Sequence, residues 1–298
     1  LHPRVRRQRQ MCIRDRYSIM AMTQGDKYAL RIFFFAAIPL AKTVAENDPK
    51  FVKKFKGKNF VFQISVLSPE FKKTGKLSTH FVVKDGKWET HTGETHPHPD
   101  IELEFSTPEK FILFFTGKGM PLPKIKGAFA HLPTFVNILM TLLRMAGLLQ
   151  ATDVPEKPED QELLVLLYIN LLTVGVSQLN RVEHPDVKHF TEGSPDRVYA
   201  FAVTGHEKLQ GWLRVKDGQT VSGRGECKRC KPFVCMRFDS PKHALEILMS
   251  KVEMIPYMQK GYLSIEGAPE FGNELSAQLF TVAYYAQGTY CLLYTSPS

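Results

Sequence analysis

Apolar residues recur with two different periods along the first half of the chain. Phe60, Phe62 and Ile64 alternate with their neighbours, which is typical of a half-buried strand. The dipeptide Asp85-Gly86 is a strong signal for a two-residue hairpin. The strands expected here cover 60–64, 76–84, 87–92, 100–105 and, as a weak last strand, 127–130. Spacings of three and four residues predict helices over 26–47 and 133–149, and one that begins at Pro108 after the capping residue Thr107.

The second half of the chain repeats this order of elements. Asp217-Gly218 repeats Asp85-Gly86, and Ser240-Pro241 repeats Thr107-Pro108 at an offset that differs by a single position. The elements expected in this half are helices over 160–180 and 241–250, a terminal helix that includes Phe271, a strand over 197–204, a hairpin over 208–224, and strands around Val234 and over 261–266. A repeat of this length is a domain rather than a solenoid unit. The fold class is therefore α+β, with two copies of a five-stranded mixed sheet that carries helices on one face.

These elements set the expected domain boundaries. Copy 1 covers 20–150, a linker with two prolines covers 151–159, and copy 2 covers 160–288. The ends, 1–19 and 289–298, look like translated sequencing-adapter sequence and are expected to be artefactual or disordered.

The formal charge of +9 depends strongly on the N-terminal end. The first sixteen residues hold six arginines and one aspartate, so leaving them out lowers the charge from +9 to +4. This weakens a nucleic-acid interpretation of the basic composition, and we expect no nucleic-acid partner.

Composition indicates soluble domains with generous apolar interiors, since 43% of the residues are hydrophobic. Away from the ends, the only cysteines are Cys227, Cys230 and Cys235, which do not make a disulfide framework and favour a reducing, cytoplasmic location. The stretch 163–180 carries no charge, but its polar C-terminal end favours a buried or interfacial helix over a membrane-spanning one.

Two short segments carry a resemblance to a known family. Pro99-Asp100-Ile101-Glu102-Leu103 and, above all, the run from Gly261 to Gly267 before an amphipathic helix resemble the sterol carrier protein type 2 lipid-binding domain. The resemblance covers nearly the whole of each copy. It implies a mixed sheet covered by helices, an apolar tunnel, and non-enzymatic binding or transfer of sterols, fatty acyl chains or phospholipids, with no cofactor.

Apolar side chains on the helices that close each sheet are the candidate lipid-binding residues. A sheet with one helical layer leaves an apolar slot if its last helix packs slightly away from it, and burial of ligand surface there is favourable. Methionines suit a pocket that adapts to irregular ligands. The same periodicity also fits plain core filling. The candidates are Phe111, Phe114, Phe115, Phe135, Leu139 and Leu142 in copy 1, and Ile247, Leu248, Met254, Met258, Phe271, Leu275 and Leu279 in copy 2.

Candidates for other chemistry are weaker. Cys227 and Cys230 supply half of a zinc site, and His96 and His98 are possible further ligands, with exposed loop residues as the alternative. We expect no catalytic residues, because the sequence shows no convincing arrangement of an acid–base pair or of a nucleophile with its base.

Two hypotheses of different classes follow. The first is a soluble lipid carrier with one apolar pocket per copy, for which the lysines between Lys50 and Lys58 provide transient contact with an anionic membrane surface. The second is an accessory or interaction module with filled cores that supports a partner enzyme and carries an apolar patch on its outside. The sequence does not set the oligomeric state.

Overall fold

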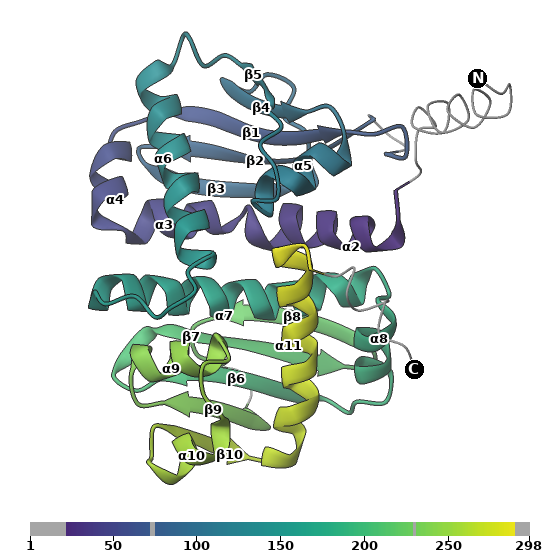
Figure 1. The fold of residues 1–298 in the computed structure, drawn as a ribbon, viewed down its shortest axis with the longest axis vertical. Helices are drawn as coiled ribbons and strands as arrows, with labels where there is room; N and C mark the ends of the chain where they lie inside the picture. The colour runs from purple at the N-terminus through teal and green to yellow at the C-terminus, as the bar shows by residue number, and fades with distance from the viewer. Residues whose placement is uncertain (1–21, 72–74, 229–230, 290–298) are drawn as a thin grey trace, which may run out of the picture.

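Five strands in the first half of the chain form a mixed sheet in the computed structural model, which describes residues 22–71, 75–228 and 231–289 (Figure 1). The strands are β1 (Phe60–Leu67), β2 (Lys76–Lys84), β3 (Lys87–Thr92), β4 (Ile101–Phe105) and β5 (Lys124–Lys126). Their order is β3-β2-β1-β4-β5, in which β1 and β4 are parallel and the other neighbours are antiparallel. The inner face of the sheet carries buried apolar residues such as Phe62, Ile64 and Phe81.

The second half builds the same sheet. Its strands are β6 (Arg197–Val203), β7 (His206–Lys216), β8 (Gln219–Arg224), β9 (Val234–Phe238) and β10 (Leu263–Gly267), in the order β10-β9-β6-β7-β8. Here β6 and β9 form the parallel pair. The predicted α+β class with two five-stranded mixed sheets is thus confirmed, because each strand of the first repeat has its counterpart in the second.

One strand was assigned to the wrong residues. The weak last strand of the first repeat, expected over 127–130, is instead β5 at 124–126, and the chain turns at Gly127 with φ +73°. A Cβ atom at Gly127 would lie 1.8 Å from the carbonyl oxygen of Asp100, and one at Gly267 would lie 2.0 Å from that of Phe233. Both repeats therefore end their last strand at a glycine whose backbone passes close to the strand beside it.

The helices follow the predicted order, with additions. The first predicted helix, 26–47, is divided into α2 (Gln24–Ile32), a π-helix η2 (Phe33–Ala37) and α3 (Leu40–Asn47), because Pro39 has no amide hydrogen to continue the ladder. The other expected helices are α5 (Pro108–Phe115), α6 (Leu132–Leu149), α7 (Pro158–Arg181), α9 (Pro241–Leu248) and α11 (Gly272–Gln287). The structure adds α4 (Pro49–Phe55), α8 (Pro185–Glu192), α10 (Met254–Gln259) and the short 3-10 helix η3 (Pro269–Phe271).

Capping side chains begin the equivalent helices of the two repeats, as predicted. The hydroxyl of Thr107 accepts a hydrogen bond from the Lys110 amide at the start of α5, and the hydroxyl of Ser240 accepts one from the His243 amide at the start of α9. Each cap satisfies an amide that has no partner inside its helix.

The two repeats meet through their first helices (Figure 1). The segment formed by α2, η2 and α3 contacts α7, and the two sheets lie on opposite sides of this helical layer. The last helix of each repeat crosses the junction, since α6 contacts α7 and α11 contacts α2. The repeats are therefore joined by helix contacts that follow an approximate twofold relation.

Among the described residues, three helical segments are long and apolar enough to cross a membrane: 24–47, 132–149 and 158–181. In the first and third, 78% of the apolar window is buried inside the protein. This confirms that the uncharged stretch 163–180 is a buried helix. In the segment 132–149, which is α6, only 22% is buried. The predicted artefactual ends, 1–19 and all of 289–298 except Thr289, lie outside the described residues.

Candidate functional site

Phenylalanine side chains fill the space between the first sheet and α5. The Phe111 ring is fully buried and stacks on Phe34 with a centroid distance of 4.7 Å. Phe115 lies 4.5 Å from Phe111 between ring centroids, and Phe114 contacts Phe105 at 5.3 Å. Phe111 therefore serves as core, whereas Phe114 and Phe115 are half-buried at the edge of the core.

Helix α6 lies at the surface but carries apolar residues on its outer side as well as its inner side. An inner stripe that includes Ile138, Leu142 and Met145 is buried against its neighbours. The outer side is also apolar and is solvent-exposed; we call it the α6 apolar face, formed by Leu132, Val136, Leu139, Met140 and Leu143. A surface helix normally places polar residues on its outer side. This helix departs from that pattern over its whole length.

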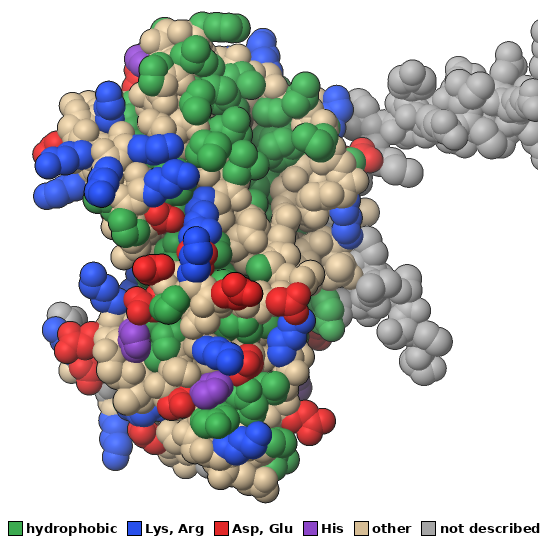
Figure 2. Space-filling view, turned by 60° about the vertical axis from the view of Figure 1, so that its left-hand side comes forward, with side chains coloured by type: hydrophobic (Ala, Val, Ile, Leu, Met, Phe, Trp, Pro, Cys, Tyr) green, Lys and Arg blue, Asp and Glu red, His purple; other side chains and the backbone are tan. Residues whose placement is uncertain are grey.

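The segment before α6 extends this exposed surface. Phe129 is 98% exposed, and Met120, Leu122 and Ile125 are exposed as well. Figure 2 shows hydrophobic side chains gathered on this side of the first repeat. Exposed apolar patches of this kind mark surfaces that bind proteins, membranes or ligands.

The single charged residue of α6 faces the protein. Arg144 Nε lies 3.2 Å from Asp48 Oδ2, and its Nη2 atom pairs with Asp160 at the start of α7. Burial lowers the pKa of Arg144, but the hydrogen bonds to the two carboxylates outweigh this, and the net result is a raised pKa. The outer side of α6 is thus left without charge while its inner side is fixed to α3 and α7.

Helix α11, the counterpart of α6, has a different outer surface. Leu275, Val282 and Tyr285 are buried. Val282 packs closely on Gly175 of α7, since a Cβ added at Gly175 would lie 2.4 Å from Val282 Cγ1. Its exposed positions mix Glu274 and Gln287 with apolar residues. Of these two closing helices, α6 alone therefore presents a continuous apolar face.

A group of lysines lies beside this face. Helix α4 contacts α6 and is anchored in the core by Phe51 and Phe55. Within the described part of the chain none of the nearby lysines forms an ion pair, and in Figure 2 basic side chains flank the hydrophobic area. We call them the α4 lysines: Lys50, Lys53, Lys54, Lys56 and Lys58.

The structure divides the predicted lipid-binding residues into three groups. Phe111, Leu142, Leu275 and Leu279 are buried in the cores. Leu139 and Met258 are exposed. The remaining seven are half-buried: Phe114, Phe115, Phe135, Ile247, Leu248, Met254 and Phe271. Of these residues, Leu139 belongs to the α6 apolar face and Phe135 lies on the same helix. The sequence reasoning therefore named one residue of this face and missed Leu132, Val136, Met140 and Leu143.

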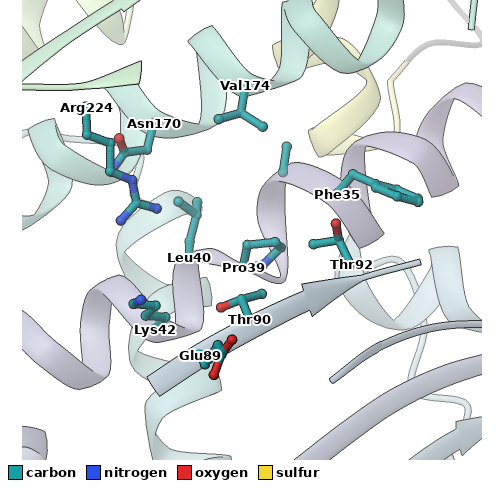
Figure 3. Close-up of a pocket in the computed structure, with 11 residues that line it drawn as sticks. Phe35, Pro39, Leu40, Lys42, Glu89, Thr90, Thr92, Asn170, Val174 and Arg224 are labelled. Carbon is teal, nitrogen blue, oxygen red and sulfur yellow. The ribbon is translucent and has the colours of Figure 1, made fainter. Parts of the chain in front are cut away.

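Two hollows stand out among the described residues, and neither is lined by these side chains. One lies at the junction of the repeats and has a volume of about 350 Å³ (Figure 3). The other is an open depression on the β7–β8 hairpin around Arg214 and Val221. The apolar tunnel beneath the closing helix stays a prediction.

The junction hollow is lined from both repeats. Its apolar wall includes Leu40 and Val174, and its polar residues include Lys42, Asn170 and Arg224. These residues lie on separate elements, so no local pattern in the sequence marks them. The signal that could have located the hollow is the repeat, because Arg224 at the end of β8 and Thr92 at the end of β3 occupy equivalent positions and both line it.

The metal candidates do not come together. Cys230 lies outside the described residues, and Cys227 is disulfide-bonded, so its thiolate is not free to coordinate a metal, contrary to the expectation of reduced cysteines. His96 Nδ1 accepts a hydrogen bond from the His98 amide at 3.2 Å. Among the described residues no group of three or more histidine, cysteine or acidic side chains is arranged to hold a metal ion.

Comparison with known proteins gives little further information. No family model matches this chain, and no curated protein matches it. Among solved structures, it is similar to the solution structure of a conserved hypothetical protein from Thermus thermophilus that is described as a possible sterol carrier protein. The match has a TM-score of 0.27 and 15% identity, and it covers 43% of this chain and 88% of the other. A likeness at this level does not establish a family for the chain.

Proposed function

We propose that this protein is a non-enzymatic lipid-binding protein built from two domains that resemble the sterol carrier protein type 2 lipid-binding domain. The observation that carries the proposal is the α6 apolar face, an exposed helix side without charge. Sterols and acyl chains are recognised through apolar surface, and each Å² removed from water contributes about 25 cal/mol. Phe135 of the same helix is half-buried and packs against the core.

The α4 lysines support membrane contact as the way in which the first repeat collects its ligand. An amphipathic surface binds bilayers most strongly when its apolar part inserts while adjacent lysines contact anionic headgroups. Each lysine near such a surface contributes about 1 kcal/mol. The proposed docking orientation places the outer side of α6 in the headgroup region and α4 beside it.

The test uses the full chain with vesicles of phosphatidylcholine, with and without phosphatidylserine, and measures co-sedimentation and the lipid retained afterwards by native mass spectrometry. The double variant Leu139→Asp, Leu143→Asp is expected to lower vesicle binding at least about tenfold, because two carboxylates cannot enter the bilayer. The matched control is Val221→Asp, Ile255→Asp, which charges two exposed apolar positions of the second repeat. Equal binding by both variants would contradict the proposal.

A second candidate function is an interaction module that supports a partner enzyme. It is favoured by the burial of Leu275, Val282 and Tyr285 of α11 and by an exposed apolar patch of the kind that protein interfaces bury. The same two double variants separate the candidates. If native protein retains no lipid and does not bind vesicles, while the Leu139→Asp, Leu143→Asp variant loses a protein partner, the interaction module holds.

A further inference from the structure

The hollow at the junction of the repeats lies between two sheet edges. Strand β3 is the edge of the first sheet and β8 the edge of the second, and η2, α3 and α7 lie between them. Figure 3 shows Asn170 and Arg224 from the second repeat on one side of the hollow and Thr90 and Thr92 from β3 on the other. Residues of both repeats are therefore required to form it.

Two buried polar atoms at this hollow have no hydrogen-bond partner among the residues that the structure describes. Asn170 is 2% exposed, and its Nδ2 atom donates to no group; the Thr90 Oγ1 atom is also buried without a partner. Buried polar groups are almost always paired, and leaving one unpaired costs about 1–3 kcal/mol. An unpaired amide donor in the wall of a cavity indicates that an acceptor from a ligand belongs there.

Two cationic side chains line the same space. Within the described residues neither Arg224 nor Lys42 forms an ion pair. Arg224 retains solvent exposure as a whole residue, yet desolvation of its guanidinium lowers its pKa, against a smaller opposite effect of Glu46. An arginine stays charged in proteins even so. The ligand's polar group is thus an anion.

The rest of the lining limits the ligand further. The apolar part of the lining comes from Phe35, Ala36, Pro39, Leu40 and Val174. Glu89 also lines the hollow, and its Oε1 atom lies 3.5 Å from His91 Nε2. This carboxylate disfavours a doubly charged phosphate more than a singly charged group. A volume of about 350 Å³ is at the small end of ligand pockets and suits a small or medium-length ligand.

From these observations we infer that the junction hollow binds the carboxylate and the first part of the chain of a medium-length fatty acid. The carboxylate accepts hydrogen bonds from Arg224 and from the Asn170 amide, with Lys42 nearby, and the acyl chain lies along Leu40, Pro39 and Val174. The site is separate from the α6 apolar face and does not depend on membrane docking.

The test is isothermal titration calorimetry of the full chain with decanoate, 1-decanol and inorganic phosphate. Decanoate is expected to bind at least about tenfold more tightly than decanol, because only the carboxylate can accept charge-assisted hydrogen bonds. Phosphate is expected to bind at least about tenfold more weakly than decanoate because of Glu89 and the apolar wall. Equal binding of decanoate and decanol, tighter binding of phosphate, or no binding of decanoate would overturn the inference.

Substitutions of residues that line the junction hollow test whether decanoate binds there. Arg224→Gln and Asn170→Leu are each expected to weaken decanoate binding at least about fivefold, and Val174→Phe, which fills the hollow, is expected to abolish it. The matched control is Arg214→Gln, an arginine on β7 that is bound to Asp196 instead. Unchanged affinity of Arg224→Gln and Val174→Phe would also refute the site. The Leu139→Asp, Leu143→Asp variant is expected to bind decanoate normally, so failure of membrane docking and failure of this site are distinguishable.

Discussion

The Nε2 atom of His184 lies 3.0 Å from the hydroxyl oxygen of Tyr285, which joins the start of α8 to the last turn of α11. Tyr28 of the first repeat packs on both rings, with centroid distances of 4.7 Å to His184 and 5.6 Å to Tyr285. The junction of the repeats therefore contains a buried aromatic cluster with a titratable member.

This cluster predicts a loss of stability in mild acid. Burial lowers the pKa of His184, and Asp186 opposes this only in part. The unfolded chain then binds a proton that the folded protein does not, so stability is full above the ordinary histidine pKa near 6.5 and falls as the pH drops below it. Urea unfolding from about pH 7.5 to about pH 5.5 measures this. His184→Gln is expected to reduce the dependence.

The exposed His189 supplies the control for this prediction. His189→Gln should leave the pH dependence as it is in the unaltered protein. Burial also lowers the pKa of His80, which therefore contributes to the dependence that persists in His184→Gln. A His184→Gln protein with the full pH dependence would show that the cluster does not control it.

A second prediction concerns the buried carboxylate of Glu102. Burial by itself would raise its pKa, but hydrogen bonds from Lys76, Ser65, Gln63 and Lys126 outweigh this and lower the pKa to about 2. The stability it provides is therefore present above about pH 4.5 and is lost as the pH falls toward 2. Glu102→Gln is expected to cost about 3 kcal/mol at neutral pH, measured by urea unfolding.

The second repeat offers a matched comparison for Glu102. The position equivalent to Glu102 is Cys235. Beside it the charges are exchanged: Arg237 stands where the first repeat has Glu104, and Glu266 where it has Lys126. Arg237 Nε lies 2.8 Å from Glu266 Oε1. The Arg237–Glu266 pair is exposed, so Glu266→Gln should cost less than about 1 kcal/mol. An equal loss in the free energy of unfolding for Glu102→Gln and Glu266→Gln would contradict the burial of Glu102.

Two helical glycines give opposite predictions. At Gly175 a Cβ would lie 2.4 Å from Val282 Cγ1, so Gly175→Ala forces α7 and α11 apart and should cost about 1–3 kcal/mol. A Cβ at Gly147 would meet no side chain or distant backbone within 4 Å among the described residues, so Gly147→Ala should stabilise α6 by about 0.5–1 kcal/mol. Thermal unfolding of both variants checks the pair, and a stabilising Gly175→Ala would show that the two helices are not in close contact.

The assignment of α6 to the surface can be tested by two adjacent leucines. Leu142 is 9% exposed and Leu143 is 57% exposed. Leu142→Ala should cost about 2 kcal/mol or more, while Leu143→Ala should change stability by less than about 0.5 kcal/mol and still weaken vesicle binding. Chemical denaturation and co-sedimentation measure the two effects, and a large stability cost at Leu143 would mean that α6 is packed on its outer side as well.

The sequence by itself determined the elements, their order and the duplication. Alternation around Phe62, the Asp85-Gly86 turn and the Thr107 cap depend on backbone geometry within a few residues, and these features are local enough to be read from one chain. It misplaced β5, because so short a strand carries too little periodicity, and it did not predict the break at η2 or the short helices α4, α8 and α10.

Only the tertiary structure decided which apolar residues are core and which are surface. Leu139 and Leu142 have the same chemistry and fit the same helical period, but the position of α6 against α3, α4 and α7 buries one and exposes the other. The junction hollow likewise requires Asn170 of the second repeat to meet Leu40 of the first, far away along the chain. Periodicity defines the faces of an element, and the packing of distant elements determines what each face contacts.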